Sequence, residues 1–451
     1  MSCTTDRLVN DPCAGCGCRF SPSQDPRGAS AAVRIAQSIE GAFVRHPRLL
    51  GGLHLFMIAV YLVLIALPPL LPTPASDAAV FGSFVRFSQF VIWCLWWPFV
   101  VLSMIAFGRG WCGILCPEGA LAAYGSRYGA NRPIPNWMRW GGIPLLAFTA
   151  ITVLGQLLEV DEHPVPQLMI LGGSTLLAVS VALAYRRGTW VWCRYLCPVS
   201  LLFGVFSRLG AMHFRVDRER LDAGRAYANA AHGKDPCPVL IHLPVMATNR
   251  YCVMCFRCAG WRDAIHLRFR APGEELLRIN AAEPLFWEVI FLFAGAIGLP
   301  LGVFHAEVHE LEGIPLVASL FGTTVLCGFV LSALTWLSAR MVHSVLSGPC
   351  GMRDLFTRIG YLYAPLALFS LFLGLSLPTF AHLKTIGFPQ PASDIIRGCV
   401  LAAGAIWSGY LAKRILSLQS ADRARTTAAL SPHVVGIAAA LAAWIPVLFR
   451  M

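Results

Sequence analysis

The chain has 451 residues, of which 56% are hydrophobic and only 13% are charged, and its net charge is +12. Its mean hydropathy of +0.62 excludes an ordinary soluble protein and is typical of a polytopic membrane protein. In such a protein the excess of Lys and Arg gathers in cytoplasmic loops, so nucleic-acid binding is a poor explanation of the charge. The sixteen cysteines fall mostly in short motifs, which indicates metal or redox chemistry rather than a disulfide scaffold.

Residues 1–30 are polar, rich in Pro, Gly and Ser, and contain no apolar signal segment. We interpret them as a cysteine-containing tail. Glycines beside its cysteines would let the backbone fold tightly around a metal ion or a further cluster. The alternative is a reactive or incidental group of thiols. The candidate ligands here are Cys3, Cys13, Cys16 and Cys18.

About nine apolar segments follow, each close to the length that crosses ~30 Å of hydrocarbon as a helix. A polar segment, residues 207–282, separates the fourth span from the fifth. We predict an all-α membrane helical bundle in residues 31–206 and 283–451, with a small ferredoxin-like iron–sulfur segment in residues 207–282. The predicted spans lie near residues 51–71, 84–107, 140–158, 165–185, 284–304, 315–336, 361–380, 395–411 and 433–449.

Basic residues alternate from loop to loop along the chain. They precede the first span and follow the second, fourth, sixth and eighth, whereas the loops at 159–164 and 305–312 are acidic. By the positive-inside rule the N-terminus and the segment 207–282 are cytoplasmic, and the C-terminus lies outside. We expect a multi-pass protein of the bacterial cytoplasmic (inner) membrane.

A hairpin with a cysteine pair occurs twice. The second span ends in W-C-G-I-L-C-P and the fourth in W-C-R-Y-L-C-P, and Ser-Arg and Gly recur at equal offsets after each motif. A third, degenerate copy would place His343 where Cys112 stands, although the matches at this basic helix end could be coincidence.

Two cysteines four residues apart share one face of a helix, and the proline after the second ends regular hydrogen bonding. Two such pairs on neighbouring hairpins would converge on one centre. Four thiolates suit a second [4Fe–4S] cluster or another soft metal. Reducible thiols and simple packing are the alternatives. The four residues are Cys112, Cys116, Cys193 and Cys197.

The stretch N-R-Y-C-V-M-C-F-R-C-A-G-W spaces Cys252, Cys255 and Cys258 as C-x2-C-x2-C. Thiolates with this spacing can hold three corners of an iron–sulfur cube. The nearest upstream candidate for the fourth corner is Cys237, which precedes a proline. We predict a [4Fe–4S] cluster on these four cysteines, and a zinc ion on the same ligands is the alternative.

The two C-x3-C-P motifs and the run C-V-M-C-F-R-C resemble the NapH/NosR/CcoG-type membrane-bound ferredoxin family, over about residues 50–270. The resemblance implies a redox protein that passes electrons between the quinol or cytoplasmic pool and a periplasmic reductase or maturation system. The chain departs from the family in having one C-x2-C-x2-C run instead of two full motifs, and extra spans after residue 283. The sequence has no large periplasmic flavin-binding domain, so a full NosR-like protein is not expected.

Histidines form a further group of candidates. His305 and His309 would share a helical face at the outer end of the fifth span, with Glu307 or Glu310 nearby. This arrangement suits a divalent metal, and a haem or quinone site on this side or a solvated polar loop are alternatives. At a helix mouth, His343 is either a functional ligand or a plain interfacial residue.

Two functions follow from these patterns. In the first, the chain is a membrane-bound iron–sulfur electron-transfer component of an oxidoreductase system, without catalytic residues that we can assign. It would pass electrons between a quinol or cytoplasmic donor and a partner reductase or dehydrogenase. In the second, it is an assembly or metal-handling factor in copper or oxidase maturation, and a purely structural anchor is a weaker third. Arginines near the cysteines, at 127, 208, 250 and 257, would stabilise cluster charge.

No run of cysteines crosses the membrane. A haem or quinone in the bundle would therefore have to complete a route to the outside, or exchange is limited to quinone and cytoplasmic partners. The expected partners are membrane lipid, redox proteins and a quinone, with no nucleic acid.

Overall fold

The computed structural model describes residues 31–72, 80–221, 237–277, 285–343, 351–419 and 423–449. The candidate ligands in the N-terminal tail, Cys3, Cys13, Cys16 and Cys18, lie outside these ranges. In the N-terminal half the α-helices are α1 (Ala31–Arg45), α2 (Pro47–Ala66), α3 (Phe84–Gln89), α4 (Trp97–Phe107), α5 (Pro117–Ser126), α6 (Gly142–Leu157), α7 (Pro164–Gln167), α8 (Gly173–Ala184) and α9 (Ser200–Ser207). Later in the chain come α11 (Glu274–Leu277), α12 (Phe286–Phe291), α13 (Leu299–Val308), α14 (Gly313–His343), α15 (Met352–Gly360), α16 (Ala364–Leu375), α17 (Leu377–Thr385), α18 (Gln390–Gln419) and α19 (Arg423–Phe449).

The prediction of a polytopic helical membrane protein is confirmed. Within the described ranges, eight helical segments are long and apolar enough to cross a membrane, and the shorter apolar helix α6 occupies the place of the predicted third span. The eight are Pro47–Leu70, Phe84–Phe107, Pro164–Ala184, Phe286–Val308, Gly313–His343, Met352–Thr385, Gln390–Gln419 and Ala424–Phe449.

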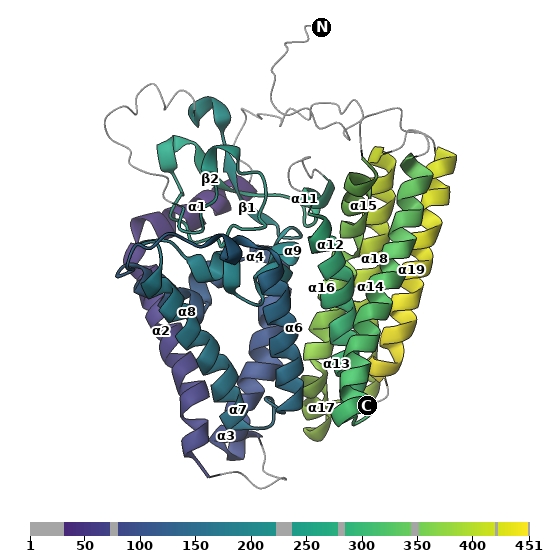
Figure 1. Ribbon diagram of the computed structural model, residues 1–451, viewed down its shortest axis with the longest axis horizontal. Coiled ribbons are helices and arrows are strands. Elements are labelled where there is room, and N and C mark those ends of the chain that lie inside the picture. The colour runs from purple at the N-terminus through teal and green to yellow at the C-terminus, as the bar shows by residue number, and fades with distance from the viewer. Residues whose placement is uncertain are drawn as a thin grey trace, which may run out of the picture.

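The spans form two side-by-side groups. Figure 1 shows the N-terminal spans on the left and the C-terminal ones, from α12 onward, on the right. The sheet strands β1 (Met212–Val216) and β2 (Ile265–Phe269) lie with α1 at one end of the bundle, whereas α3, α7 and α17 lie at the other. The molecule therefore has a sheet end and an opposite end, and the functional groups below are placed relative to these.

Several spans contain π-helical turns, which are rare and often occur at functional sites. One such turn, Phe90–Trp96, lies within the span from α3 to α4, and two more carry the cysteine motifs, at Trp111–Leu115 and Trp192–Leu196. In these two turns the amides of Cys116 and Cys197 bond to carbonyls five residues back, at 2.8 and 2.9 Å. The repeated sequence therefore builds the same local structure twice.

The two hairpins also pack on each other reciprocally. Helix α5 of the first packs on α8 of the second, and α9 of the second packs on α4 of the first. The amide of Ala130 donates to the carbonyl of Leu183 (2.7 Å), and the amide of Ala211 donates to Ile105 (2.9 Å). The helix after each cysteine turn thus packs on the membrane span of the other hairpin. This packing brings the two cysteine turns together.

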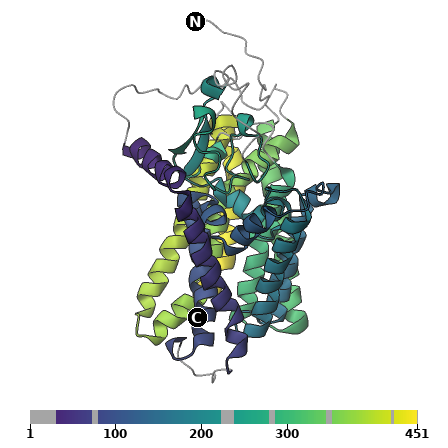
Figure 2. The same ribbon diagram turned by 90° about the vertical axis from the view of Figure 1, so that its left-hand side faces the viewer.

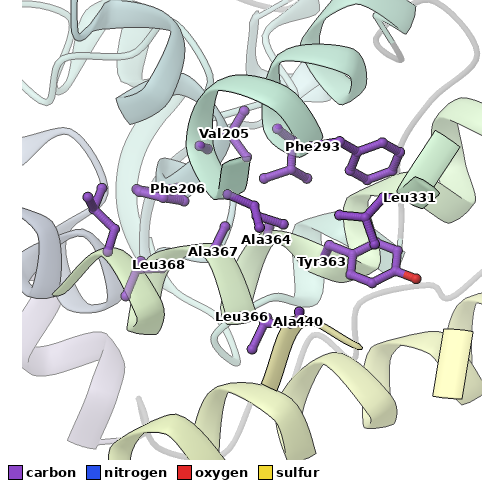
Figure 3. Packing of buried hydrophobic residues seen from close by; sticks show 14 of the residues in the cluster. Val205, Phe206, Phe293, Leu331, Tyr363, Ala364, Leu366, Ala367, Leu368 and Ala440 are labelled. Atoms are coloured by element: carbon purple, nitrogen blue, oxygen red, sulfur yellow. The ribbon is translucent and has the colours of Figure 1, made fainter. Parts of the chain in front are cut away.

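Between the two groups of spans lies an apolar core. Figure 3 shows Val205 and Phe206 of α9 packed near Phe293, with Ala364 and Leu368 of α16 below them. All of these side chains are buried. Burial of large apolar side chains contributes about 1.5–3 kcal/mol each in water, but within a membrane close packing carries more of the stabilisation.

A buried ionic network joins the same parts of the chain. Arg208, at the end of α9, is fully buried and lies 3.3 Å from Glu288 of α12. The same carboxylate is 3.1 Å from Arg250, and it accepts a hydrogen bond from Tyr361. The C-terminal spans are therefore tied through Glu288 to the loop that contains the C-x2-C-x2-C run.

The polar segment contributes the antiparallel pair β1–β2, in which Met212 lies opposite Phe269 and Val216 opposite Ile265. The sequence did not predict these strands. Helix α1 covers them: Glu40 accepts a hydrogen bond from the amide of Leu267 (2.8 Å). Figure 2 shows α1 lying obliquely above the first span, at the sheet end of the molecule.

Candidate functional site

The first candidate site is the loop with the C-x2-C-x2-C run, between β1 and β2 in the chain. Its three thiols and that of Cys237 line a single small cavity, closed by Phe214, Leu243 and other apolar side chains. Negative charge on Cys252, Cys255 or Cys237 would raise the pKa of the Cys258 thiol. The four sulfur atoms are therefore close neighbours. The structure therefore brings together the four cysteines that the sequence predicted to share one site.

The loop curls because two of its residues are left-handed. Met254 and Phe256, on either side of Cys255, have φ values of 54° and 59°, and non-glycine residues adopt this region at an energetic cost. The curl turns backbone amides toward sulfur. The amides of Met254 and Arg257 hydrogen-bond to Cys252 and Cys255.

The thiols at this site are poorly suited to ionise by themselves. Burial raises the pKa of Cys252 to about 12 and that of Cys255 to about 11, and it also raises the pKa of Cys258. Thiolate ligands form readily only where a metal compensates the charge. Donor type, inward amides and burial thus fit a [4Fe–4S] cluster, with Cys237, Cys252, Cys255 and Cys258 as its ligands.

The second candidate site lies at the cysteine turns of the two hairpins. Cys112, Cys116, Cys193 and Cys197 line one common cavity, and their charges influence one another. Burial is the largest cause of raised pKa values at Cys116, Cys193 and Cys197. The amide of Gly119 also donates to the sulfur of Cys116, at 3.4 Å. As at the loop site, burial therefore disfavours the ionised form of these thiols.

Two charged residues complete the hairpin site. Arg109 is only 3% exposed, lies beside Cys112 and donates to the backbone carbonyl of Arg250 at 3.2 Å. Glu118 receives a hydrogen bond from the hydroxyl of Thr175 at 3.4 Å, and burial raises the pKa of Glu118. Arg109 is one of the basic residues after the second span that indicated the membrane orientation, and its position at the thiols was not predicted. Its place three residues before Cys112 was the available signal.

The two sites are in direct contact. Gly113, the residue after Cys112, lies so close to the loop that a Cβ atom there would be 2.0 Å from the carbonyl oxygen of Val253 and 2.9 Å from the amide of Cys255. Three hairpin cysteines belong to the same packed apolar cluster as Cys255 and Cys237. Groups held at the two sites would therefore be neighbours.

A cavity of about 520 Å³ extends from the hairpin thiols into the membrane region. Its wall is largely aromatic, with Trp93, Trp96, Trp97, Trp111 and Trp192 among the lining residues. At the end away from the thiols it is lined by polar side chains, namely Arg86, Gln89, Gln156, Asp161, Glu307 and His382. The cavity therefore has a sulfur end and an acidic end.

The two histidines predicted at the outer end of the fifth span, His305 and His309, are neighbours, but they do not line the cavity that Glu307 lines. The rings of His305 and His309 lie 4.5 Å apart, and Nδ1 of His305 is 3.3 Å from the hydroxyl of Ser319. Glu307 lines the cavity, whereas neither histidine does. His343 is exposed at the end of α14.

In the part of the chain that the structure describes, no group of three or more His, Cys, Asp or Glu side chains converges tightly enough for a single metal ion. Sulfur ligands of zinc must all lie about 2.3 Å from one atom. A cube with an iron at each corner spans more widely spaced sulfurs. The loop thiols therefore stay predicted ligands of a cluster, with zinc as the alternative, and His305 and His309 stay a predicted pair.

Comparison with known proteins points to the same residues. The family of 4Fe-4S binding domains matches residues 89–135 and 169–217, the two hairpins with their cysteine turns. YccM of Escherichia coli (strain K12), whose name provisionally describes an electron transport protein, is 25% identical over 187 residues. That alignment covers 36% of this chain and 50% of YccM, so the chain spans about half the length of this relative.

No solved structure matches the chain significantly. The similarity supports a ferredoxin-type 4Fe-4S family, and it does not single out the NapH/NosR/CcoG type.

Proposed function

We propose that this protein is a membrane-bound iron–sulfur electron-transfer component that carries two [4Fe–4S] clusters. Cys237, Cys252, Cys255 and Cys258 would hold one, and the four hairpin cysteines the other. The observation that carries the proposal is the contact of Gly113 with the backbone of Val253. It supports two neighbouring sets of four thiols, each of them buried or partly buried. Such clusters supply one-electron transfer when bound.

The surrounding residues suit this role. Arg109 lies beside the hairpin thiols and Arg257 acts on Cys255, so positive charge would offset that of thiolate-ligated clusters. Apolar side chains such as Phe214, Leu243 and Val239 shield the loop site. Exclusion of water and fixed charge are the means by which a protein sets a cluster's reduction potential.

A quinol in the membrane cavity is the proposed electron donor. A volume of about 520 Å³ is typical of a small-molecule site, and the aromatic wall suits a flat ring. The cavity opens directly on Cys112, Cys116, Cys193 and Cys197. Haem is less well supported, because His382 is the one histidine among the described residues that line this cavity, and it lies at the far end.

The proposed location is the bacterial inner membrane, with the iron–sulfur segment and N-terminus in the cytoplasm and the C-terminus outside. Loops rich in Arg at the sheet end and acidic loops at the opposite end support this orientation. The electron acceptor would then be a reductase or dehydrogenase system with a cytoplasmic contact.

The metal-handling alternative is supported by one observation, the close approach of His305 to His309. It predicts copper binding at that pair and no reaction with quinol. The electron-transfer proposal predicts the opposite, so the two functions can be separated by one preparation.

The test is iron and acid-labile sulfide analysis of anaerobically purified protein, with EPR. We expect about eight irons per chain, since each cube holds four. Cys252→Ser and Cys193→Ser should each remove about four, and Cys399→Ser, at an exposed cysteine, should remove none. Decylubiquinol should reduce the clusters of the unaltered protein. A colourless, iron-free preparation, or one that binds copper through His305 and ignores quinol, contradicts the proposal.

A further inference from the structure

We propose that Glu307 and Asp161 form the proton exit of the quinol site, so that electrons leave the cavity at the thiol end and protons leave at the opposite face. This inference rests on the proposed function, because it concerns the same cavity. It adds a direction to the reaction: oxidation of the quinol would separate its electrons from its protons across the membrane.

The cavity has the length that this separation needs. One face of the continuous span from α3 to α4 lines it from Arg86 to Val101. With a rise of about 1.5 Å per residue, fifteen residues correspond to roughly 20 Å. Figure 1 shows α3 at the end of the bundle opposite the strands β1 and β2. A group at the acidic end is thus far from the thiols although it shares their cavity.

The two carboxyl groups are arranged as a relay. Glu307, near the end of α13, lines the cavity and is hydrogen-bonded by the side chain of Gln156. Asp161 lies close enough to Glu307 for the two to interact electrostatically. It stands in the loop between α6 and α7 and is exposed. Glu307 is exposed as well, so a proton received at this end of the cavity can reach solvent from either carboxyl group.

Polar side chains also line the wall between the two ends. Ser174 and Glu118 line the cavity near the thiols, Thr152 lines it further along α6, and Gln156 lies beside Glu307. The charged groups that share the acidic end are Arg86 and His382.

The thiol end offers an anchor for the reacting oxygen. Arg109 lines the cavity and is 97% buried, and its Nε has no hydrogen-bond partner within the described ranges. A buried guanidinium N–H without a partner is costly, and a quinol or quinone oxygen would satisfy it. The ring would thereby be held beside the hairpin thiols.

The reaction balances as follows. One quinol loses two O–H protons and two electrons and becomes one quinone. A cluster held by the hairpin cysteines would accept the two electrons one at a time, and a one-electron acceptor outside the protein, ferricyanide in the test, would take them up in turn. The two protons pass by way of Glu307 and Asp161 to the opposite face.

The test uses full-length, cluster-loaded protein in phosphatidylcholine–phosphatidylglycerol vesicles that contain a pH dye, with decylubiquinol as donor. Ferricyanide does not cross the membrane, so it reports only molecules whose iron–sulfur face points outward. Valinomycin with potassium compensates charge. We expect the lumen to acidify by one proton for each ferricyanide reduced, and a protonophore to abolish the acidification but not the reduction.

Glu307→Gln should slow quinol-dependent ferricyanide reduction by about tenfold or more and remove lumen acidification, and Glu307→Asp should restore part of both. Quenching of tryptophan fluorescence by quinone should be unchanged, which separates proton transfer from binding and folding. Asp161→Asn should act in the same direction. The matched controls are Glu310→Gln and Glu159→Gln, exposed acids that do not line the cavity, and both should behave as the unaltered protein.

The outcomes distinguish the two proposals. Absence of ferricyanide reduction in the unaltered protein refutes quinol as the donor. Reduction with protons released on the ferricyanide side, or lumen acidification that persists in Glu307→Gln, overturns the proton exit and leaves electron transfer standing.

Discussion

Gly113 lies against the carbonyl of Val253, so the first cysteine turn of the membrane hairpins and the loop with three cysteines touch through their backbones. No side chain fits between them, because a Cβ at Gly113 would stand 2.0 Å from the Val253 oxygen. His54 fixes the same turn, with its Nε2 at 3.1 Å from the carbonyl of Gly113. One glycine thus permits the close approach of the two candidate sites.

Gly113→Ala should push the loop away from the hairpin turn, because a backbone oxygen cannot yield as a flexible side chain can. We expect magnetic coupling between the two reduced clusters to weaken and electron transfer between them to slow several-fold. EPR and rapid-mixing spectroscopy would measure these effects. Gly52→Ala is the control, since a Cβ there meets nothing within 4 Å. Unchanged coupling in Gly113→Ala would show that the contact does not set the cluster spacing.

Removal of the buried charge at Arg109 should make the hairpin site harder to reduce. A positive charge favours the more negative, reduced state of a nearby cluster, and a buried charge is weakly screened. Arg109→Gln should therefore lower the reduction potential of this site by tens of millivolts, measured by EPR-monitored redox titration. Arg186→Gln, at an exposed position, should leave the potential in place. Equal potentials in both variants would rule out the proposed electrostatic role.

The Arg208–Glu288 pair should be important for stability because neither side chain reaches solvent. Arg208→Ala leaves a buried carboxylate that has lost one of its charge partners, which typically costs ~3–5 kcal/mol. A marked fall of the melting temperature in detergent is expected.

The exposed pair of Arg220 and Asp263, at 2.9 Å, provides the comparison. Arg220→Ala should change stability by no more than ~1 kcal/mol. Similar melting temperatures for Arg208→Ala and Arg220→Ala would mean that the buried network contributes little.

His213, on β1, should make the polar segment sensitive to acid. Burial, followed by the charge of Arg270, lowers the pKa of His213 from 6.5 to about 3. Above pH 6.5 the imidazole is neutral in both folded and unfolded chains and has no effect. Between pH 6.5 and about 3 the unfolded chain binds the extra proton, so the free energy of unfolding falls as pH falls.

The measurement is the melting temperature at pH 7.5 and pH 5 in detergent. The unaltered protein should lose more stability over this range than His213→Gln, which has no group to titrate. Acid effects on the clusters themselves are common to both proteins and cancel in the comparison. An equal loss in the two would assign the acid sensitivity to other groups.

The sequence alone determined the parts of this protein that depend on local pattern. Apolar runs defined the spans because a helix must satisfy its own backbone in lipid, and α6 and the eight longer segments occur where these runs lie. The C-x3-C-P and C-x2-C-x2-C spacings identified both sets of thiols, because ligand spacing along a turn or loop is a local property. The repeat of 111–117 at 192–198 likewise predicted two equivalent turns.

Only the tertiary structure decided which of these local features meet. The contact of Gly113 with Val253 and the pairing of Arg208 with Glu288 join residues 80 or more positions apart. The place of Arg109 among the thiols depends on side-chain direction. No periodicity of the sequence encodes these relationships. The same holds for the cavity that links the hairpin cysteines to Glu307, and for β1 and β2, whose pairing spans the polar segment. The hydrophobic pattern sets which segments enter the membrane. The packing of helices that are distant in the sequence sets which side chains meet there.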